Sequence, residues 1–201
     1  MDASLSGRLG ERMCAAALLA HSLYRNVAGD GRNILETVLV VLVAALGFGV
    51  STFLGGASAG SLATGLLAGI VLEPLVTLAA WLGGSFAAWL VGARLAPAEA
   101  KSIRFWTVAR VLVFAQTPNL AGVLVILPPP YTSGVWLMAR LWLLAATSTA
   151  IRESLGLSGG RVLVTLAVSA AVYAALLVGI FSAIASLDVG RVTSVHGIGG
   201  L

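Results

Sequence analysis

Five runs of apolar residues, each long enough to cross a lipid bilayer as a helix, constrain this chain more than any other feature of its sequence. A helix rises about 1.5 Å per residue, so about 20 apolar residues cross the ~30 Å of hydrocarbon. The runs do not alternate polar and apolar residues, which argues against strands. We therefore predict an all-α, polytopic membrane protein, a bundle of five transmembrane helices. The predicted spans are residues 34–54, 66–95, 105–127, 133–151 and 162–186.

The composition agrees with this class and excludes several others. Hydrophobic residues make up 59% of the chain and charged residues 10%, whereas a soluble domain has about 25% charged residues. The chain is basic, but it has no basic run and no aromatic–basic face, so no nucleic-acid partner is expected. Cys14 is the one cysteine, and His21 and His196 lie far apart. We therefore predict no disulfide, no metal site and no cofactor.

One short stretch imitates a catalytic motif. Gly56–Gly60 reads GASAG and matches the hydrolase pattern G-x-S-x-G around Ser58, with Asp188 and His196 later in the chain. That motif needs a strand before the serine, and no strand is expected here. We predict no catalytic residues and no enzyme activity.

The ends of the chain differ from the membrane domain, residues 34–186. Residues 1–33 are predicted to form a cytoplasmic arm with one short helix, Leu9–Leu23, on the membrane surface. Cys14 lies in this helix, and we expect a buried thiol there rather than a palmitoylation site. Residues 187–201 are glycine-rich and are predicted to form a mobile extracytoplasmic tail.

The positive charges orient the predicted spans. Cytoplasmic loops of membrane proteins carry an excess of lysine and arginine. If the N-terminus is cytoplasmic, Arg191 is the only basic residue in a loop or at a span end that faces outward. The residues that face in are Arg8, Arg12, Arg25, Arg32, Arg94, Lys101, Arg104, Arg152 and Arg161. We therefore predict a multi-pass protein of the cell inner membrane with an extracytoplasmic C-terminus.

Three charged residues, Glu73, Arg110 and Arg140, lie deep inside the predicted spans, away from their ends. A charge at the bilayer centre costs roughly 2.5–3.5 kcal/mol, so each should face the bundle and find a partner. Counting from the span ends places them at similar depths, and we predict one buried polar cluster. It is either an ion pair that fixes helix registry or a site for an anionic headgroup or a proton. Registry is favoured, because arginine stays protonated and only one acid is present.

Two prolines, Pro74 and Pro118, are predicted to kink their helices. A proline leaves backbone carbonyls without donors, and local polar side chains commonly satisfy them. Gln116, Thr117 and Asn119 surround Pro118 and are expected to do so and to contact neighbouring helices. A ligand site is the less favoured interpretation of this stretch.

A polar hairpin separates the last two predicted spans. It carries Arg152, Glu153, Ser158 and Arg161, and charge orientation places it in the cytoplasm. We expect Gly156 to end one helix and Ser158 to cap the next.

Three segments of the chain resemble a known family. Arg110-x-x-x-Phe114-Ala115-Gln116-Thr117-Pro118 resembles the R-x-x-x-F-A-Q-x-P signature of bacterial members of the Yip domain family, the Ypt/Rab-interacting-protein-like membrane proteins. Leu141-Trp142-Leu143-Leu144, followed by Ala150-Ile151-Arg152-Glu153-Ser154-Leu155-Gly156-Leu157-Ser158 and Arg161, resembles a second family stretch. Leu23-Tyr24 with Val27-Ala28-x-Asp30 resembles the segment before the family's first span. The similarity covers about residues 23–186.

The resemblance implies five spans, a cytoplasmic N-terminus and an outward C-terminus. Eukaryotic relatives act in vesicle trafficking and bind small GTPases through a cytoplasmic N-terminal region. Here that region is short, and the composition is typical of a bacterium, so the trafficking role does not carry over. We expect a non-enzymatic membrane organiser or adaptor that recruits partners at its cytoplasmic face.

The alternative is a small transporter or lipid-handling protein that uses Glu73, Arg110 and Arg140. Membrane lipids are the expected surroundings in either case. The small-residue faces Gly56–Gly60 and Gly65–Gly69 also allow a protein partner or a homo-oligomer.

Overall fold

The structure is a computed structural model that describes residues 3–29, 34–58, 62, 66–96, 103–126 and 131–196. Every regular element in these ranges is a helix, which confirms the predicted all-helical class. Three helices are long and apolar enough to cross a membrane, namely Gly69–Leu95, Ser133–Leu155 and Gly160–Ile180. The apolar stretch Leu35–Gly47 is shorter. The membrane class therefore rests on three helices, and the count of five spans stays a prediction.

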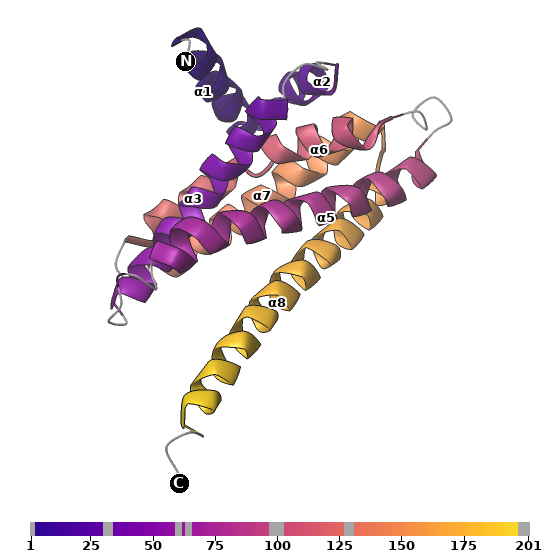
Figure 1. The fold of residues 1–201 in the computed structure, drawn as a ribbon. Helices are drawn as coiled ribbons and strands as arrows, with labels where there is room; N and C mark the ends of the chain where they lie inside the picture. Colours follow the sequence, from indigo (N-terminus) through magenta and orange to yellow (C-terminus); the bar gives the residue numbers. More distant parts are fainter. Residues whose placement is uncertain are drawn as a thin grey trace.

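The helices run back and forth through one bundle, from which the last helix departs (Figure 1). The elements are α1 (Ala3–Ala17), α2 (His21–Gly29), α3 (Ile34–Ser58), η1 (Leu67–Leu72), α5 (Glu73–Leu95), α6 (Phe105–Phe114), η3 (Thr117–Ile126), α7 (Tyr131–Leu155) and α8 (Gly160–His196). Helices α1 and α2 lie at one end of the molecule, and α8 runs away toward the other end. Helix α8 packs mainly on α5. In the stretch Gly160–Ile180 few of its side chains are buried, as lipid contact requires.

The N-terminal arm differs from the prediction of one helix over Leu9–Leu23. The chain forms two helices instead, α1 and α2, and Leu19 between them has a φ of 56°. Residues other than glycine rarely adopt this left-handed backbone conformation, so the packing of the helices on either side holds the turn. Cys14 is exposed, which corrects the expected buried thiol.

Polar contacts fasten the arm to the bundle. The Nη1 atom of Arg12 donates to both carboxylate oxygens of Glu36 in α3, at 3.0 and 2.8 Å. The indole nitrogen of Trp142 in α7 donates to the carbonyl of Ala17 at 2.8 Å. Helix α1 is thus tied to two different helices of the bundle.

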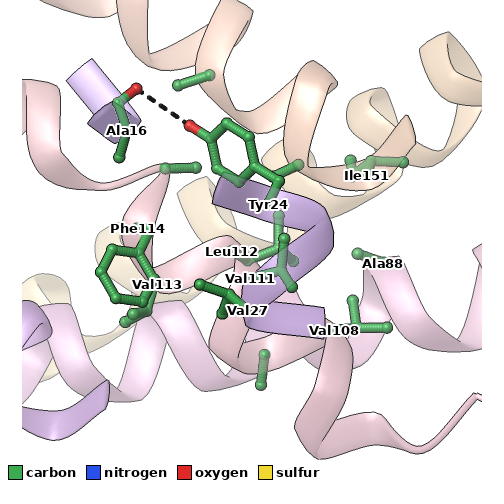
Figure 2. Close-up of a cluster of buried hydrophobic side chains, with 14 of the residues drawn as sticks. Ala16, Tyr24, Val27, Ala88, Val108, Val111, Leu112, Val113, Phe114 and Ile151 are labelled. Carbon is green, nitrogen blue, oxygen red and sulfur yellow. Dashed lines mark hydrogen bonds between the residues drawn. The ribbon is translucent and has the colours of Figure 1, made fainter. Parts of the chain in front are cut away.

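Tyr24 places the arm inside the main hydrophobic core. Its side chain is fully buried, and its hydroxyl donates to the carbonyl of Ala16 at 3.2 Å. Figure 2 shows the ring among side chains of the bundle, with Leu112 and Ile151 near it. The arm and the membrane domain therefore share one core.

The buried phenol makes stability depend on alkaline pH. Burial raises the pKa of Tyr24 to about 12, whereas an unfolded tyrosine titrates near ~10. Between these pH values the unfolded chain loses the Tyr24 proton and the folded chain keeps it. The stabilisation that the buried, protonated phenol contributes is therefore complete below pH ~10 and is lost toward pH ~12. We expect wild type to lose about 2–3 kcal/mol of unfolding free energy in this window relative to Tyr24→Phe. Denaturant unfolding in detergent at stepped pH measures it, and parallel curves for the two proteins would contradict it.

Two helix irregularities replace the simple kinks predicted at the prolines. Residues Leu67–Leu72 form a π-helix directly before Pro74, which occupies the first turn of α5. The predicted span 105–127 is not one α-helix, because α6 ends at Phe114 and a 3-10 helix follows. The break falls at residues 115–116, before Pro118, which itself lies in the 3-10 helix.

The turn between α7 and α8 follows the prediction in part. Gly156 has a φ of 61° directly after the end of α7, as a helix-ending glycine should. Helix α8 begins at Gly160, and Gly159 before it has a φ of 53°. The backbone N–H of Arg161 donates to the carbonyl of Ser158 at 3.3 Å, and the cap by the Ser158 side chain stays a prediction. Helix α8 continues past the predicted end at 186 to His196, and residues 197–201 lie outside the described part of the chain.

Candidate functional site

The three charges predicted to form one cluster are divided between two places. Glu73 at the start of α5 and Arg140 in α7 interact electrostatically, and Tyr173 of α8 interacts with both. Arg110 lines a separate cavity beside α2 and α3. Its Nε atom donates to the carbonyl of Trp106 at 3.3 Å, so the side chain lies back toward the start of α6. Counting residues along the span predicted how deep Arg110 lies in the membrane, but not the direction of its side chain.

Sequence reasoning missed Tyr173 as a member of the Glu73–Arg140 group. A tyrosine inside an otherwise apolar span was the available signal, because its hydroxyl needs a polar partner when buried. The π-helix η1 ends directly before Glu73. Such helix irregularities often occur at functional sites.

Of the polar residues around Pro118, Thr117 bonds a backbone carbonyl, whereas Gln116 and Asn119 bond each other. The hydroxyl of Thr117 donates to the carbonyl of Phe114 at 2.7 Å, which caps the broken end of α6. The amide nitrogen of Asn119 donates to the side-chain oxygen of Gln116 at 2.8 Å. All of these side chains are buried, so the pair stabilises the junction between α6 and η3.

A large basic cavity, here named the arginine cavity, lies between α2, α3, α5 and α6. Its volume is about 540 Å³, within the range of roughly 300–1,000 Å³ that is typical of ligand pockets. Among the described residues that line it, Arg104 and Arg110 are cations and none is an acid. The lining residues are Ala28, Gly29, Thr37, Val38, Leu78, Trp81, Leu82, Arg104, Trp106, Thr107 and Arg110.

An aromatic cluster indicates the depth of this cavity. Trp89 and Phe86 near the end of α5 pack against Phe105, with ring centroids 6.2 and 6.0 Å away. Phe105 packs on Trp106, with ring centroids 5.0 Å apart, and Trp106 is half exposed. The Trp89 indole nitrogen donates to the carbonyl of Ile103 at 2.9 Å. Tryptophans at span ends typically lie at the level of lipid headgroups.

A smaller cavity, here named the serine cavity, lies between α5, α6, α7 and α8. Its volume is about 80 Å³. Two buried polar atoms on its lining residues, Trp81 Nε1 and Ser85 Oγ, have no hydrogen-bond partner. Trp81 also lines the arginine cavity, so its indole borders both spaces. The lining residues are Trp81, Gly84, Ser85, Leu112, Gln116, Leu143, Leu144, Thr147, Leu166, Ser169, Ala170 and Tyr173.

Glu153 of the predicted cytoplasmic hairpin contacts the N-terminal arm. Its carboxylate lies 2.9 Å from Nδ1 of His21 and 3.2 Å from Nε of Arg25. Both basic side chains are more than half exposed. Exposed ion pairs contribute at most about 1 kcal/mol each, so Glu153 positions α2 beside the hairpin rather than dominating stability.

Of the other three hairpin residues, one bonds to the bundle and two are exposed. Arg161 donates to the carbonyl of Leu95 at 3.1 Å, which connects the hairpin to the end of α5. Arg152 and Ser158 are exposed. These two side chains are the part of the predicted hairpin surface that is open to a partner.

No protein-family model, no curated protein and no solved structure matches this chain. The resemblance to the Yip domain family therefore stays a prediction. No group of three or more metal-ligating residues occurs within the described residues. The two cavities are the features on which a function can be argued.

Proposed function

We propose that this chain is an integral membrane protein that binds the anionic headgroup of a membrane lipid in the arginine cavity. The observation that carries the proposal is the convergence of Arg104 and Arg110 on a cavity of about 540 Å³ beside the aromatic cluster. Arginine presents a planar fork of donors that matches phosphate oxygens. The hydroxyl-bearing residues Thr37 and Thr107 line the same space. A phosphate ester at headgroup depth would find both charge and hydrogen bonds there.

The membrane arrangement inferred from the sequence suits this role. Successive helices reverse direction, and α1 and the far end of α8 lie at opposite ends of the molecule (Figure 1). This supports five crossings, with α6 and η3 together forming the third. The arginine cavity then lies on the cytoplasmic side, where anionic lipids attract basic residues. The proposal follows the lipid-handling alternative and involves no enzymatic step.

The test is native mass spectrometry of the purified protein, released from vesicles that contain phosphatidylcholine and phosphatidylglycerol. Wild type is expected to retain phosphatidylglycerol in preference to phosphatidylcholine. The Arg104→Gln/Arg110→Gln double variant is expected to lose roughly tenfold or more in relative retention, because each charged hydrogen bond contributes about 1.5–3 kcal/mol. A separate arm adds free phosphate to distinguish a lipid from a soluble ion as the ligand. If the site takes a soluble ion, free phosphate is expected to displace phosphatidylglycerol.

Arg152→Gln is the control. It makes the same arginine-to-glutamine change once, at an exposed position outside the cavity. We expect it to retain phosphatidylglycerol as wild type does. Equal losses in both variants would indicate unspecific surface attraction and would overturn the proposal, provided that both proteins elute as single species.

A second candidate function is the recruitment of a protein partner to the cytoplasmic face, as for a Yip-type membrane organiser. The exposure of Arg152 and Ser158 on the hairpin favours it. The same purification distinguishes the two functions. A stoichiometric protein that is lost with Arg152→Gln, and kept with the double variant, would support the adaptor.

A further inference from the structure

We propose that the serine cavity binds the carbonyl oxygen of an uncharged molecule dissolved in the bilayer, with Ser85 and Trp81 as hydrogen-bond donors. This site is separate from the arginine cavity in its ligand chemistry and in most of its lining residues. It goes beyond the headgroup binding proposed above and does not depend on it.

The unpartnered hydroxyl of Ser85 is the first observation. Serine and threonine in membrane helices usually donate to a carbonyl one turn earlier in their own helix. Thr147 and Thr165 do so, at 2.8 and 2.9 Å, and Ser169 donates to the carbonyl of Gly84 at 2.8 Å. Ser85 is 2% exposed and does neither. A buried hydroxyl without a partner is costly, so an occupant of the cavity would restore the missing bond.

Trp81 supplies the second donor. Its side chain is 3% exposed, and its Nε1 atom has no partner. An indole N–H can only donate, and Ser85 lies one helical turn further along α5. The two groups therefore call for an acceptor such as a carbonyl oxygen. A charged ligand is disfavoured, because none of the described lining residues carries a formal charge.

The rim of the cavity indicates where the ligand comes from. Leu144 of α7 is 45% exposed, and Ala170 of α8 is also exposed. Both lie on helices that are apolar enough to cross a membrane, so this rim faces hydrocarbon. A volume of about 80 Å³ exceeds the ~30 Å³ share of one liquid water. It admits one carbonyl group, with the apolar remainder of the molecule left in the bilayer.

The test uses two uncharged carbonyl probes with the purified protein in nanodiscs. One is a benzoquinone with a decyl tail, and the other is a diacylglycerol, so the two arms separate a quinone from an acyl ester. Binding is measured by the thermal stabilisation of the protein as the probe concentration rises. We expect saturable binding of one probe, weakened roughly 2- to 10-fold by Ser85→Ala and by Trp81→Phe, since each removes one neutral hydrogen bond.

A second readout separates a ligand site from a structural hydroxyl. Without a probe, Ser85→Ala removes an unsatisfied buried group and is expected to raise Tm by roughly 2–4 °C. Ser154→Ala is the control, because the Ser154 hydroxyl donates to the carbonyl of Ile151 and lies outside the cavity. It is expected to leave probe binding unchanged.

The outcomes decide the proposal. Higher stability of Ser85→Ala without probe, combined with weaker probe binding, supports it. If neither probe gives saturable stabilisation of wild type, the cavity holds water only and the proposal is overturned. It is equally overturned if Ser85→Ala and Ser154→Ala bind the probe alike.

Discussion

Gly69→Ala is expected to destabilise the folded protein by about 3 kcal/mol or more, because the new methyl group would overlap backbone atoms. A Cβ at Gly69 would collide with the carbonyl oxygen of Gly49 and lie 2.7 Å from the backbone nitrogen of Phe53. A Cβ at Gly49 would likewise collide with the carbonyl of Gly69. Backbone atoms cannot rotate away as a side chain can. Relief requires η1 to separate from α3, and thermal unfolding in detergent measures the loss.

Gly179→Ala provides the control for this substitution. Gly179 lies in α8, and a Cβ there would meet nothing within 4 Å. Alanine favours helix over glycine by up to about 1 kcal/mol, so this variant should be as stable as wild type or slightly more stable. Equal melting temperatures for the two alanine variants would show that α3 and η1 are not in backbone contact.

Tyr24→Ala is expected to cost about 3–5 kcal/mol, as large buried aromatic residues do when truncated. The substitution empties space between α2, α6 and α7 and also removes the hydrogen bond to Ala16. Because Tyr24 fixes the arm in the shared core, α2 should also become accessible. We expect proteolytic cleavage after the exposed Arg25 to accelerate while the bundle stays helical. Unfolding and limited proteolysis in detergent measure the two effects.

Tyr131→Ala is the matched control, since Tyr131 is 66% exposed at the start of α7. Exposed substitutions usually change stability by less than about 0.5 kcal/mol. If both tyrosine variants unfold alike, or if cleavage after Arg25 is unchanged in Tyr24→Ala, then α2 does not depend on Tyr24 for its position.

The helical class and the main apolar segments were predictable from local sequence. A chain with 59% hydrophobic residues needs helices in a bilayer, because a helix satisfies its own backbone hydrogen bonds. The bond from Thr117 to the carbonyl of Phe114 was predictable for the same reason, since it acts within one turn of a single break. The glycine that ends α7, Gly156, also acts locally through its φ of 61°.

The shape of the N-terminal arm was not predictable in this way. The sequence predicted a single surface helix, but the chain turns at Leu19 and Tyr24 is buried against α6 and α7. That burial depends on residues more than eighty positions later in the chain. Cys14 became exposed through the same arrangement. No local pattern encodes which face of such a short helix the bundle will cover.

The candidate sites depended on side-chain direction even more strongly. The depth of Arg110 suggested a partnership with Glu73 and Arg140, yet its guanidinium turns back toward Trp106 and the arginine cavity. Trp81 and Ser85 lie within a predicted apolar span, where no local pattern distinguishes them. Their significance lies in the absence of acceptors around them, which is a property of four helices together.

The sequence by itself determined an all-helical membrane-type chain and an irregular helix near Pro118, because bilayer solvation and backbone hydrogen bonding act on each segment separately. Only the tertiary structure decided that Glu73 and Arg140 interact electrostatically with each other and with Tyr173, that Arg110 lines another cavity, and that Ser85 is left without a partner. Those outcomes depend on the rotation of each helix about its axis. In an apolar bundle, close packing of small residues such as Gly49 and Gly69 sets that rotation.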